Sequence, residues 1–281
     1  MKKLSVCGKG GTGKSTLVAL LARELSGEGK EVVVIDSDES NSELYRMLGL
    51  RRPPSPLLEL AGGKQNVIRN MRTSFSPGGG QPHAALLKQE QIRVDDIPGE
   101  YLVRRDGLGL VAVGKIHQAL EGCACPMGAL SREFLKRLTL AENQMAIVDM
   151  EAGIEHFGRG VETSVDAVIV VIEPSLESVT LAVKVKDLAT AAGTRFAGVV
   201  ANKIPSGEVE RHLISELNKR QLHLLVTVHR HQEIANSSLM GHELRCTEAT
   251  VEIAPLLRLL TTVSLPTSRS GAQETICEGG Y

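Results

Sequence analysis

A glycine-rich loop at residues 8–15, with the sequence GKGGTGKS, constrains the fold of this chain more than any other segment. It matches the P-loop pattern, in which glycines let backbone N–H groups approach phosphates, a lysine binds the β- and γ-phosphate oxygens and a hydroxyl binds magnesium. An apolar run at residues 4–7 precedes the loop, and residues 16–25 have helical periodicity. The loop therefore connects a strand to a helix N-terminus, which predicts a nucleotide-binding α/β fold.

The loop supplies most of the candidate ligands. Lys14 is the expected phosphate-binding lysine, and Ser15 is the expected magnesium ligand. The candidate nucleotide-binding residues of this segment are Gly8, Lys9, Gly10, Gly11, Thr12, Gly13, Lys14, Ser15 and Thr16.

Lys9 is a second lysine, one position into the motif. It cannot easily fold back onto phosphates that its own loop surrounds, so it either faces solvent, as most lysines do, or reaches another molecule. The loop resembles that of the signature-lysine (deviant Walker A) ATPases, which include the nitrogenase iron protein and chromosome-partitioning ATPases. The resemblance implies a homodimer on ATP binding, in which Lys9 contacts the partner's nucleotide, and catalytic roles for Lys9 and Lys14.

Composition narrows the class of protein further. The 281 residues carry a net charge of −1 and contain no tryptophan, so we expect no nucleic-acid partner. The chain opens on a strand pattern rather than a signal peptide, and no apolar run approaches the ~20 residues of a membrane span. Five cysteines, an odd number, do not indicate a secreted disulfide framework. We expect a cytoplasmic protein without a membrane partner.

Short apolar runs alternate with helical patterns along the chain, which is typical of a parallel sheet buried on both faces. We expect a single-domain P-loop NTPase with a mostly parallel central sheet of about seven strands and helices on both faces. Ser175 and Ser206 are expected helix N-caps. Besides the first strand, the expected strands are 32–35, 108–113, 145–149, 167–172, 196–201 and 222–228, and the expected helices include 128–140, 176–192, 207–220 and 248–262.

Two segments interrupt this alternation. Residues 51–106 are rich in proline, glycine and charge and exceed one crossover helix, so we expect a partly mobile insertion that either contacts a partner or is a tolerated surface excursion. Residues 264–281 are polar without an amphipathic period, which indicates a disordered tail. The expected ATPase domain is therefore 1–263.

Three aspartates follow predicted strands, at the sheet edge where ligands bind in this fold class. The resemblance implies that Asp38 positions or deprotonates the attacking water and that Asp36 is a structural group near magnesium; helix capping is the alternative for both. Many relatives carry proline where Glu39 stands. Asp149 corresponds to a Walker B aspartate, which holds magnesium through water. It is followed by residues 150–156, a second switch in which we assign His156 no chemistry.

Asn202 and Lys203 directly follow the strand that ends at Ala201. They resemble the family's adenine-edge contact, since an amide supplies both a donor and an acceptor; a polar turn at the strand end is the alternative. The other base-contacting segment, 226–229, lacks the proline that many relatives have. The preference for ATP over GTP is implied by the family.

Cys123 and Cys125 are separated by one residue, before a helical pattern. This spacing is poor for a mutual disulfide, but both sulfurs can bind a shared soft metal. A four-ligand site would need a second protomer, so these thiols fit a half-site at a dimer interface; two buried inert thiols are the alternative. We expect Cys7 to be buried strand packing.

The paired cysteines, residues 150–156 and the Glu173-Pro174 strand end together are similar to the nickel-insertion accessory ATPases of carbon monoxide dehydrogenase, over most of residues 1–260. The resemblance implies a metallochaperone that hydrolyses ATP slowly, uses Mg²⁺ and inserts Ni²⁺ into the nickel-iron-sulfur cluster of a carbon monoxide dehydrogenase client during maturation; Zn²⁺ could occupy the same thiols. Two alternatives stay open. One is a nickel chaperone for acetyl-CoA synthase, and the other is a partitioning or positioning ATPase that acts on DNA or membrane without metal.

Overall fold

The computed structural model describes residues 1–38, 43–74, 89–114, 125–150 and 162–262. Their main feature is an eight-stranded sheet with strand order β10-β9-β8-β1-β7-β2-β5-β4. All neighbouring strands are parallel except β4, which is antiparallel to β5. The strands are β1 (Lys3–Cys7), β2 (Glu31–Ser37), β4 (Val103–Arg105), β5 (Leu108–Ala112), β7 (Gln144–Met150), β8 (Ala167–Ile172), β9 (Arg195–Ile204) and β10 (Leu224–His229).

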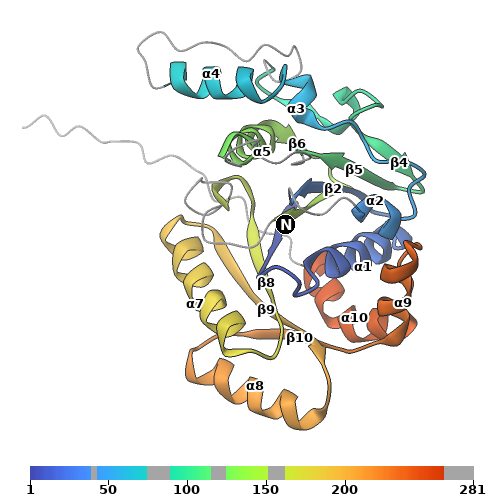
Figure 1. Ribbon diagram of the computed structural model, residues 1–281, viewed down its shortest axis with the longest axis vertical. Coiled ribbons are helices and arrows are strands. Elements are labelled where there is room, and N and C mark those ends of the chain that lie inside the picture. The colour runs from blue at the N-terminus through green and yellow to red at the C-terminus, as the bar shows by residue number, and fades with distance from the viewer. Residues whose placement is uncertain (39–42, 75–88, 115–124, 151–161, 263–281) are drawn as a thin grey trace, which may run out of the picture.

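Helices cover both faces of this sheet (Figure 1). Among the described residues they are α1 (Lys14–Gly27), α2 (Leu44–Met47), α3 (Leu57–Leu60), α4 (Lys64–Ser74), α5 (Cys125–Arg137), α7 (Leu176–Ala191), α8 (Gly207–Lys219), α9 (Gln232–Met240) and α10 (Thr247–Thr262), with short 3₁₀ turns η2 (Val94–Asp96) and η3 (Glu162–Ser164). A separate two-stranded sheet pairs β3 (Ile92–Arg93) with β6 (Leu138–Thr139). The predicted single-domain α/β fold is confirmed.

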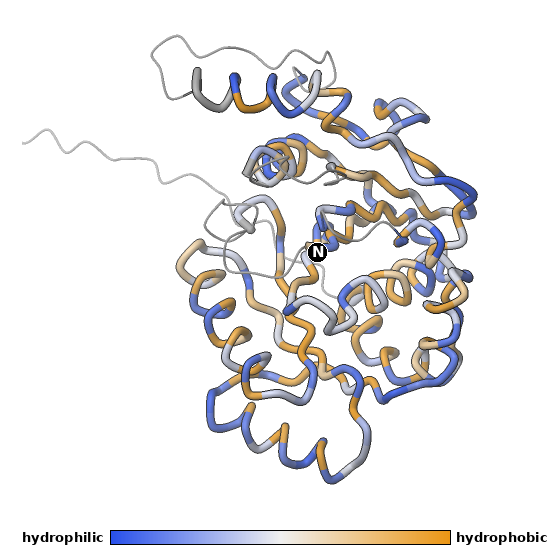
Figure 2. The backbone as a smooth tube through the Cα atoms, viewed as in Figure 1, coloured by the Kyte–Doolittle hydropathy of each residue, from blue (hydrophilic) through white to orange (hydrophobic). Residues whose placement is uncertain are grey.

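The strands are apolar on both sides because each side contacts a different helical layer. In β2, Val32 and Val34 belong to the core that contains α1 and α10, whereas Val33 and Ile35 belong to the core that contains α5, α7 and α8. The apolar residues in Figure 2 accordingly follow the inner strands of the sheet. The continuous apolar runs of the sequence therefore reflect burial on two faces.

Both predicted helix caps are present. The Ser175 hydroxyl accepts a hydrogen bond from the backbone N–H of Ser178 at 3.2 Å, at the start of α7. The Ser206 hydroxyl accepts one from the N–H of Val209 at 3.4 Å, at the start of α8. These bonds satisfy N–H groups that have no partner within the helix.

The segment 51–106 contributes more to the fold than the sequence indicated. Its described parts form α3, α4, β3 and β4, and Leu57 is fully buried in the core beside α5. The main sheet has eight strands where about seven were expected, and β4 is the additional strand. Residues 75–88 and the tail 264–281 lie outside the described residues, so their expected mobility stays a prediction. Within the described chain, the helices are too short or too polar to cross a membrane.

Two histidines and two glutamates connect the end of β10 to α10. His231 Nδ1 lies 3.0 Å from Glu248 Oε2, and His231 Nε2 lies 2.8 Å from Glu252 Oε2. His229 Nδ1 lies 2.7 Å from Glu252 Oε1. Because carboxylates only accept hydrogen bonds, the doubly protonated form of His231 satisfies both of its neighbours. Burial lowers the pKa of His231, but the hydrogen bonds and charges of Glu252 and Glu248 together outweigh it, and its pKa is raised.

This cluster predicts a pH-dependent stability. The raised pKa of His231 contributes stability that is complete below its ordinary value of 6.5 and is lost as pH rises through the folded-state pKa. Burial raises the pKa of Glu252, but hydrogen bonds from His231 and His229 outweigh it, and the lowered pKa contributes stability that is lost as pH falls below the ordinary value of 4.5. Both contributions are therefore present between about pH 4.5 and 6.5.

We expect thermal unfolding of the His231→Gln variant to depend less on pH on the alkaline side of this window than that of the wild type. His212→Gln, on the exposed side of α8, is the matched control and should keep the wild-type profile. Parallel pH profiles for the wild type and His231→Gln would contradict the assigned coupling.

Candidate active site

The P-loop joins β1 to α1 at the centre of the sheet (Figure 1). Glycine is required at two of its positions. At Gly8 the backbone φ is 148°, and an added Cβ would lie 2.2 Å from the Val171 carbonyl oxygen. At Gly13 φ is 92°, and a Cβ would lie 2.2 Å from Asn202 Nδ2. The loop is therefore packed against the ends of β8 and β9, and larger residues would displace it.

Lys14 begins α1 and is buried at the base of the loop, with 6% of its surface exposed. Its Nζ lies 3.8 Å from Asp38 Oδ2 and 3.4 Å from the Lys9 carbonyl oxygen. The N-terminal N–H groups of α1 and this ammonium face the same loop, an arrangement that favours anions. The structure thus buries Lys14 at the base of the loop, and its role in phosphate binding stays a prediction.

Three buried carboxylates surround this lysine. Asp36 and Asp149 are register partners on the neighbouring strands β2 and β7, and Asp38 follows β2 directly. Their exposed fractions are 3%, 0% and 5% respectively. Asp36 Oδ1 also accepts a hydrogen bond from the Asp38 backbone N–H at 3.3 Å, so it holds the turn that carries Asp38. Among the described residues, these three carboxylates share this edge of the sheet with one buried ammonium.

The effect of this charge is clearest at Asp149. Burial, and then the charge of Asp36, raise the pKa of Asp149 from 3.8 to about 7, against the opposing effects of the Ser15 hydroxyl and Lys14. Ser15 Oγ donates to Asp149 Oδ2 at 2.6 Å. The other oxygen, Oδ1, is buried and has no hydrogen-bond partner among the described residues.

These residues fit a magnesium ion. Mg²⁺ prefers oxygen ligands, and the buried Oδ1 of Asp149 lies on a carboxylate that already contacts a serine hydroxyl. A cation at this position would offset the repulsion between Asp36 and Asp149. Ser15 and Asp149 are the residues that would hold the ion, and their magnesium role stays a prediction.

Asn202 and Lys203, near the end of β9, contact the backbone of the P-loop. Asn202 Nδ2 donates to the Thr12 carbonyl oxygen at 2.7 Å, and the Lys203 ammonium donates to the Gly11 carbonyl oxygen. Asn202 is 7% exposed, and Lys203 has a left-handed backbone with φ of 60°. These hydrogen bonds to the loop were not predicted from the sequence, although the polar pair at the end of the strand could have indicated them. The adenine contact stays a prediction.

Lys9 does not fold back onto its own loop. Its Nζ forms an ion pair with Glu177 Oε2 at 2.6 Å, and 39% of the Lys9 side chain and 72% of the Glu177 side chain are exposed. The hydrogen bond that the Lys9 ammonium donates to Glu177 raises the pKa of Lys9. Glu177 lies in the first turn of α7, 168 residues along the chain, and nothing in the sequence indicated this contact.

The structure describes little of the two cysteines that were predicted to bind a metal. Cys123 and the second switch at 151–156 lie outside them, and only the backbone of Cys125 is described, at the start of α5. The part of the chain that the structure describes contains no group of three or more metal-binding side chains. The nickel half-site therefore stays a prediction. Cys7 is 2% exposed, and burial raises the pKa of its thiol to about 12, which confirms its packing role.

Two curated proteins illustrate what the chain resembles. It is 40% identical over 259 residues to an uncharacterised ATP-binding protein of Methanocaldococcus jannaschii, covering 92% of this chain and 99% of that protein. It is 39% identical over 205 residues to the carbon monoxide dehydrogenase accessory protein CooC of Rhodospirillum rubrum, covering 73% of this chain and 75% of that protein.

The fold is similar to that of solved cell-division ATPases. The septum site-determining protein MinD of Pyrococcus horikoshii, complexed with Mg-ADP, superposes with a TM-score of 0.67 at 18% identity, covering 93% of this chain and 96% of that one. MinD in the MinC:MinD complex of Aquifex aeolicus gives a TM-score of 0.64 at 20% identity, covering 96% and 99%. At these identities the likeness shows the fold alone.

The model of the CobQ/CobB/MinD/ParA nucleotide-binding domain matches residues 4–244, which include the P-loop, the three aspartates and Asn202. Together with the ATP-binding relatives, this match confirms the prediction of an ATPase. The chain belongs to the CobQ/CobB/MinD/ParA family of P-loop nucleotide-binding proteins.

Proposed function

We propose that the protein is an ATP-dependent dimeric metallochaperone that inserts nickel into the nickel-iron-sulfur cluster of a carbon monoxide dehydrogenase during its maturation in the cytoplasm. The observation that carries this proposal is the 39% identity to CooC over 73% of the chain. The buried site around Lys14 supports the nucleotide-dependent part, and the paired cysteines support the metal-dependent part.

The residues of the site have separate roles in the nucleotide switch. The loop amides and Lys14 bind the phosphates, and Asp38, which lies beside Lys14, positions or deprotonates the attacking water. Ser15 directly and Asp149 through water would hold magnesium, which would supply neutralisation of the phosphate charge when bound. The adenine ring is bound by Asn202 and Lys203.

Lys9 couples the nucleotide to the dimer. In the single protomer its ammonium is paired with Glu177. In the ATP-bound dimer it leaves Glu177 for the phosphates of the partner's nucleotide. Loss of the γ-phosphate removes this attraction, so that Lys9 returns to Glu177 and the dimer opens. One turnover of ATP suffices for each cycle of dimer closing and opening, so we infer slow hydrolysis.

The cargo site is formed by Cys123 and Cys125 of both protomers. Four thiolates are a complete set of soft ligands for Ni²⁺, and they also accept Zn²⁺. Closing of the dimer brings the two pairs together, and opening separates them and releases the metal to the client.

A second candidate function is a positioning or partitioning ATPase, for which the fold shared with MinD is the specific observation. It would use the same nucleotide site and dimer but would act on DNA or membrane. Sedimentation with anionic vesicles and a salt-dependent gel shift on DNA distinguish it from the chaperone.

The metal proposal predicts nickel binding by the reduced protein. We expect one Ni²⁺ per dimer with Mg-ATP, measured by metal analysis after gel filtration, and no Ni²⁺ with the double variant Cys123→Ser, Cys125→Ser. Cys277→Ser is the matched control and should retain the metal. Nickel retained by the double variant, or no soft metal bound by the wild type, would contradict the proposal.

The dimer proposal predicts opposite effects of two substitutions. Lys9→Ala should stay monomeric with Mg-ATP in analytical ultracentrifugation while still binding nucleotide. Glu177→Gln removes the competing ion pair, so its dimer should form at lower protein concentration, by several-fold at most because both side chains are exposed. Lys184→Ala, an exposed lysine of α7, is the control. Dimerisation of Lys9→Ala like that of the wild type would refute the role of Lys9.

The buried carboxylate predicts a trade-off between activity and stability at Asp149. Asp149→Asn should lower magnesium-dependent ATP hydrolysis by roughly 10–100-fold. Because the folded-state pKa of Asp149 is raised from 3.8 to about 7, the wild type loses stability as pH rises through this interval, and asparagine does not titrate. Without nucleotide, the melting temperature of Asp149→Asn should therefore exceed that of the wild type by more above pH 7 than in acid. Asp187→Asn, on the exposed side of α7, should change neither quantity. Wild-type hydrolysis by Asp149→Asn would contradict the assignment.

A further inference from the structure

Strand β4 ends the main sheet with an unpaired side. It pairs with β5 through Val103, Arg104 and Arg105, and within the described residues no strand pairs with its outer edge. Such an edge presents backbone N–H and C=O groups to another extended chain. Several domains bind peptides by adding a strand at an edge of this kind.

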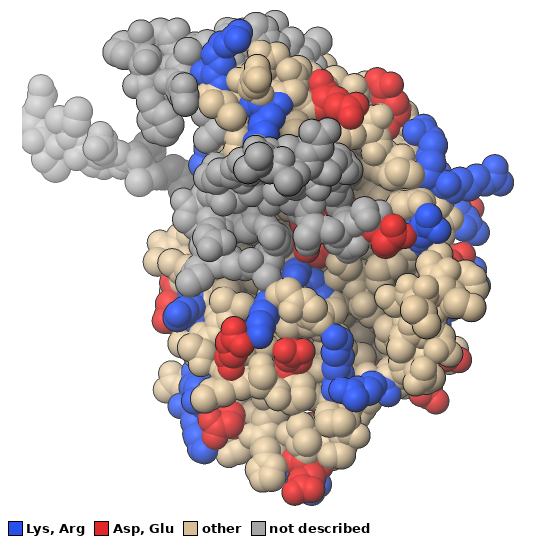
Figure 3. Space-filling model, viewed as in Figure 1, with Lys and Arg blue, Asp and Glu red and all other residues tan. Residues whose placement is uncertain are grey.

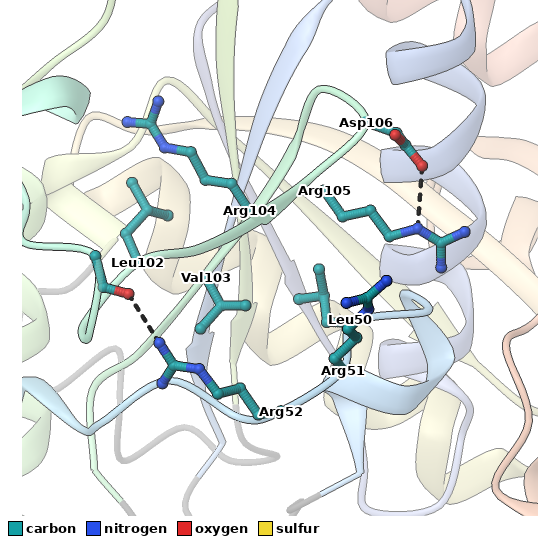
Figure 4. Close-up of a pocket in the computed structure, with 9 residues that line it drawn as sticks. Leu50, Arg51, Arg52, Leu102, Val103, Arg104, Arg105 and Asp106 are labelled. Carbon is teal, nitrogen blue, oxygen red and sulfur yellow. Dashed lines mark hydrogen bonds and ion pairs between the residues drawn. The ribbon is translucent and has the colours of Figure 1, made fainter.

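A hollow of about 790 Å³ lies beside this edge (Figure 4). Its walls come from β4 and from residues 50–52, which run along the sheet edge before α3. The two walls are joined at their ends: Arg105 donates to the Gly49 carbonyl oxygen, and Arg52 Nη2 donates to the Gly99 carbonyl oxygen at 3.3 Å. We call this hollow the arginine slot, because four of its nine lining residues are Arg51, Arg52, Arg104 and Arg105, against one aspartate, Asp106.

The arginines of the slot differ in their partners. Arg104 is paired with Asp95 at 3.0 Å, and Arg105 with Asp106 at 3.0 Å. Arg52 contacts a backbone carbonyl but no carboxylate, and Arg51 has neither a hydrogen bond nor an ion pair within the described residues. The two arginines on the wall opposite β4 are therefore free to bind carboxylates.

This positive charge is local. The chain as a whole carries a net charge of −1. On the face shown in Figure 3, acidic and basic groups are interspersed over most of the surface, whereas basic side chains gather at the margin where Figure 1 shows β4. The slot is therefore complementary to an acidic ligand although the protein as a whole is not basic.

We propose that the arginine slot binds an extended acidic segment of a partner protein. The backbone of the segment pairs with the outer edge of β4, and its carboxylates form charge-assisted hydrogen bonds with Arg51 and Arg52. Two features favour a peptide over a nucleic acid: the edge offers backbone pairing, and the lining contains no aromatic side chain on which a base could stack.

The slot is separate from the nucleotide site. Strand β4 lies four strands from β1 in the sheet order, which at the usual strand spacing is about 19 Å. A bound segment therefore leaves the P-loop accessible, and the inference goes beyond the nucleotide switch and the metal.

The test uses the full-length protein and a fluorescein-labelled peptide of alternating glutamate and valine, with binding followed by fluorescence anisotropy. We expect Arg51→Glu, which removes no hydrogen bond or ion pair within the described residues, to weaken binding about tenfold. Arg211→Glu, an exposed arginine of α8, makes the same charge change and should leave binding unchanged. ATP hydrolysis by Arg51→Glu should equal that of the wild type, so failure of the slot is distinguishable from failure of the nucleotide site.

Two further probes separate the parts of the inference. A peptide with glutamine in place of glutamate should lose binding, which would show that carboxylates are recognised. A peptide with alternate N-methylated amides, which cannot pair along a strand edge, should also lose binding. Equal binding of the methylated peptide, equal weakening by Arg211→Glu, or displacement by a single-stranded oligonucleotide in place of the acidic peptide would overturn the proposal.

Discussion

The structure depends on buried negative charge at the carboxyl edge of the parallel sheet. Asp36 and Asp149 are held side by side by the pairing of β2 with β7, and Lys14 is the buried cation beside them. The raised pKa of Asp149 and its unpartnered Oδ1 are direct consequences of this arrangement. A cation bound at this edge would relieve the repulsion between Asp36 and Asp149 that the strand pairing creates.

Contacts from β8 and β9, which lie on the opposite side of β1 from β7 and β2, hold the P-loop beside these carboxylates. Gly8 packs on the end of β8, and Asn202 and Lys203 donate hydrogen bonds to the loop carbonyls from β9. The loop is thus fixed between strands on both sides of β1, so its N–H groups are oriented before a nucleotide binds. A movement of the end of β9 would be transmitted directly to the phosphates.

Much of this site could be predicted from sequence because its parts are local. The P-loop and Asp38 directly follow β1 and β2, Asp149 lies near the end of β7, and buried strands are recognisable as apolar runs. The partners of Lys9 and Thr12 were not predictable, because Glu177 and Asn202 lie 168 and 190 residues away and meet them only through the sheet order. Strand β4 was missed because three residues, two of them arginines, carry no recognisable alternation.

The weakness of the Lys9–Glu177 pair is what makes it suitable for a switch. Both groups are exposed, so water competes with the contact, and little free energy is lost when it breaks. A buried pair would hold Lys9 too firmly for a second protomer to recruit it in the proposed dimer. The exposed ion pair keeps Lys9 on the side of the loop that faces α7 and away from its own phosphate site. The pair thus orients Lys9 in the single protomer, and in the proposed dimer its release would depend on the charge of the partner's nucleotide.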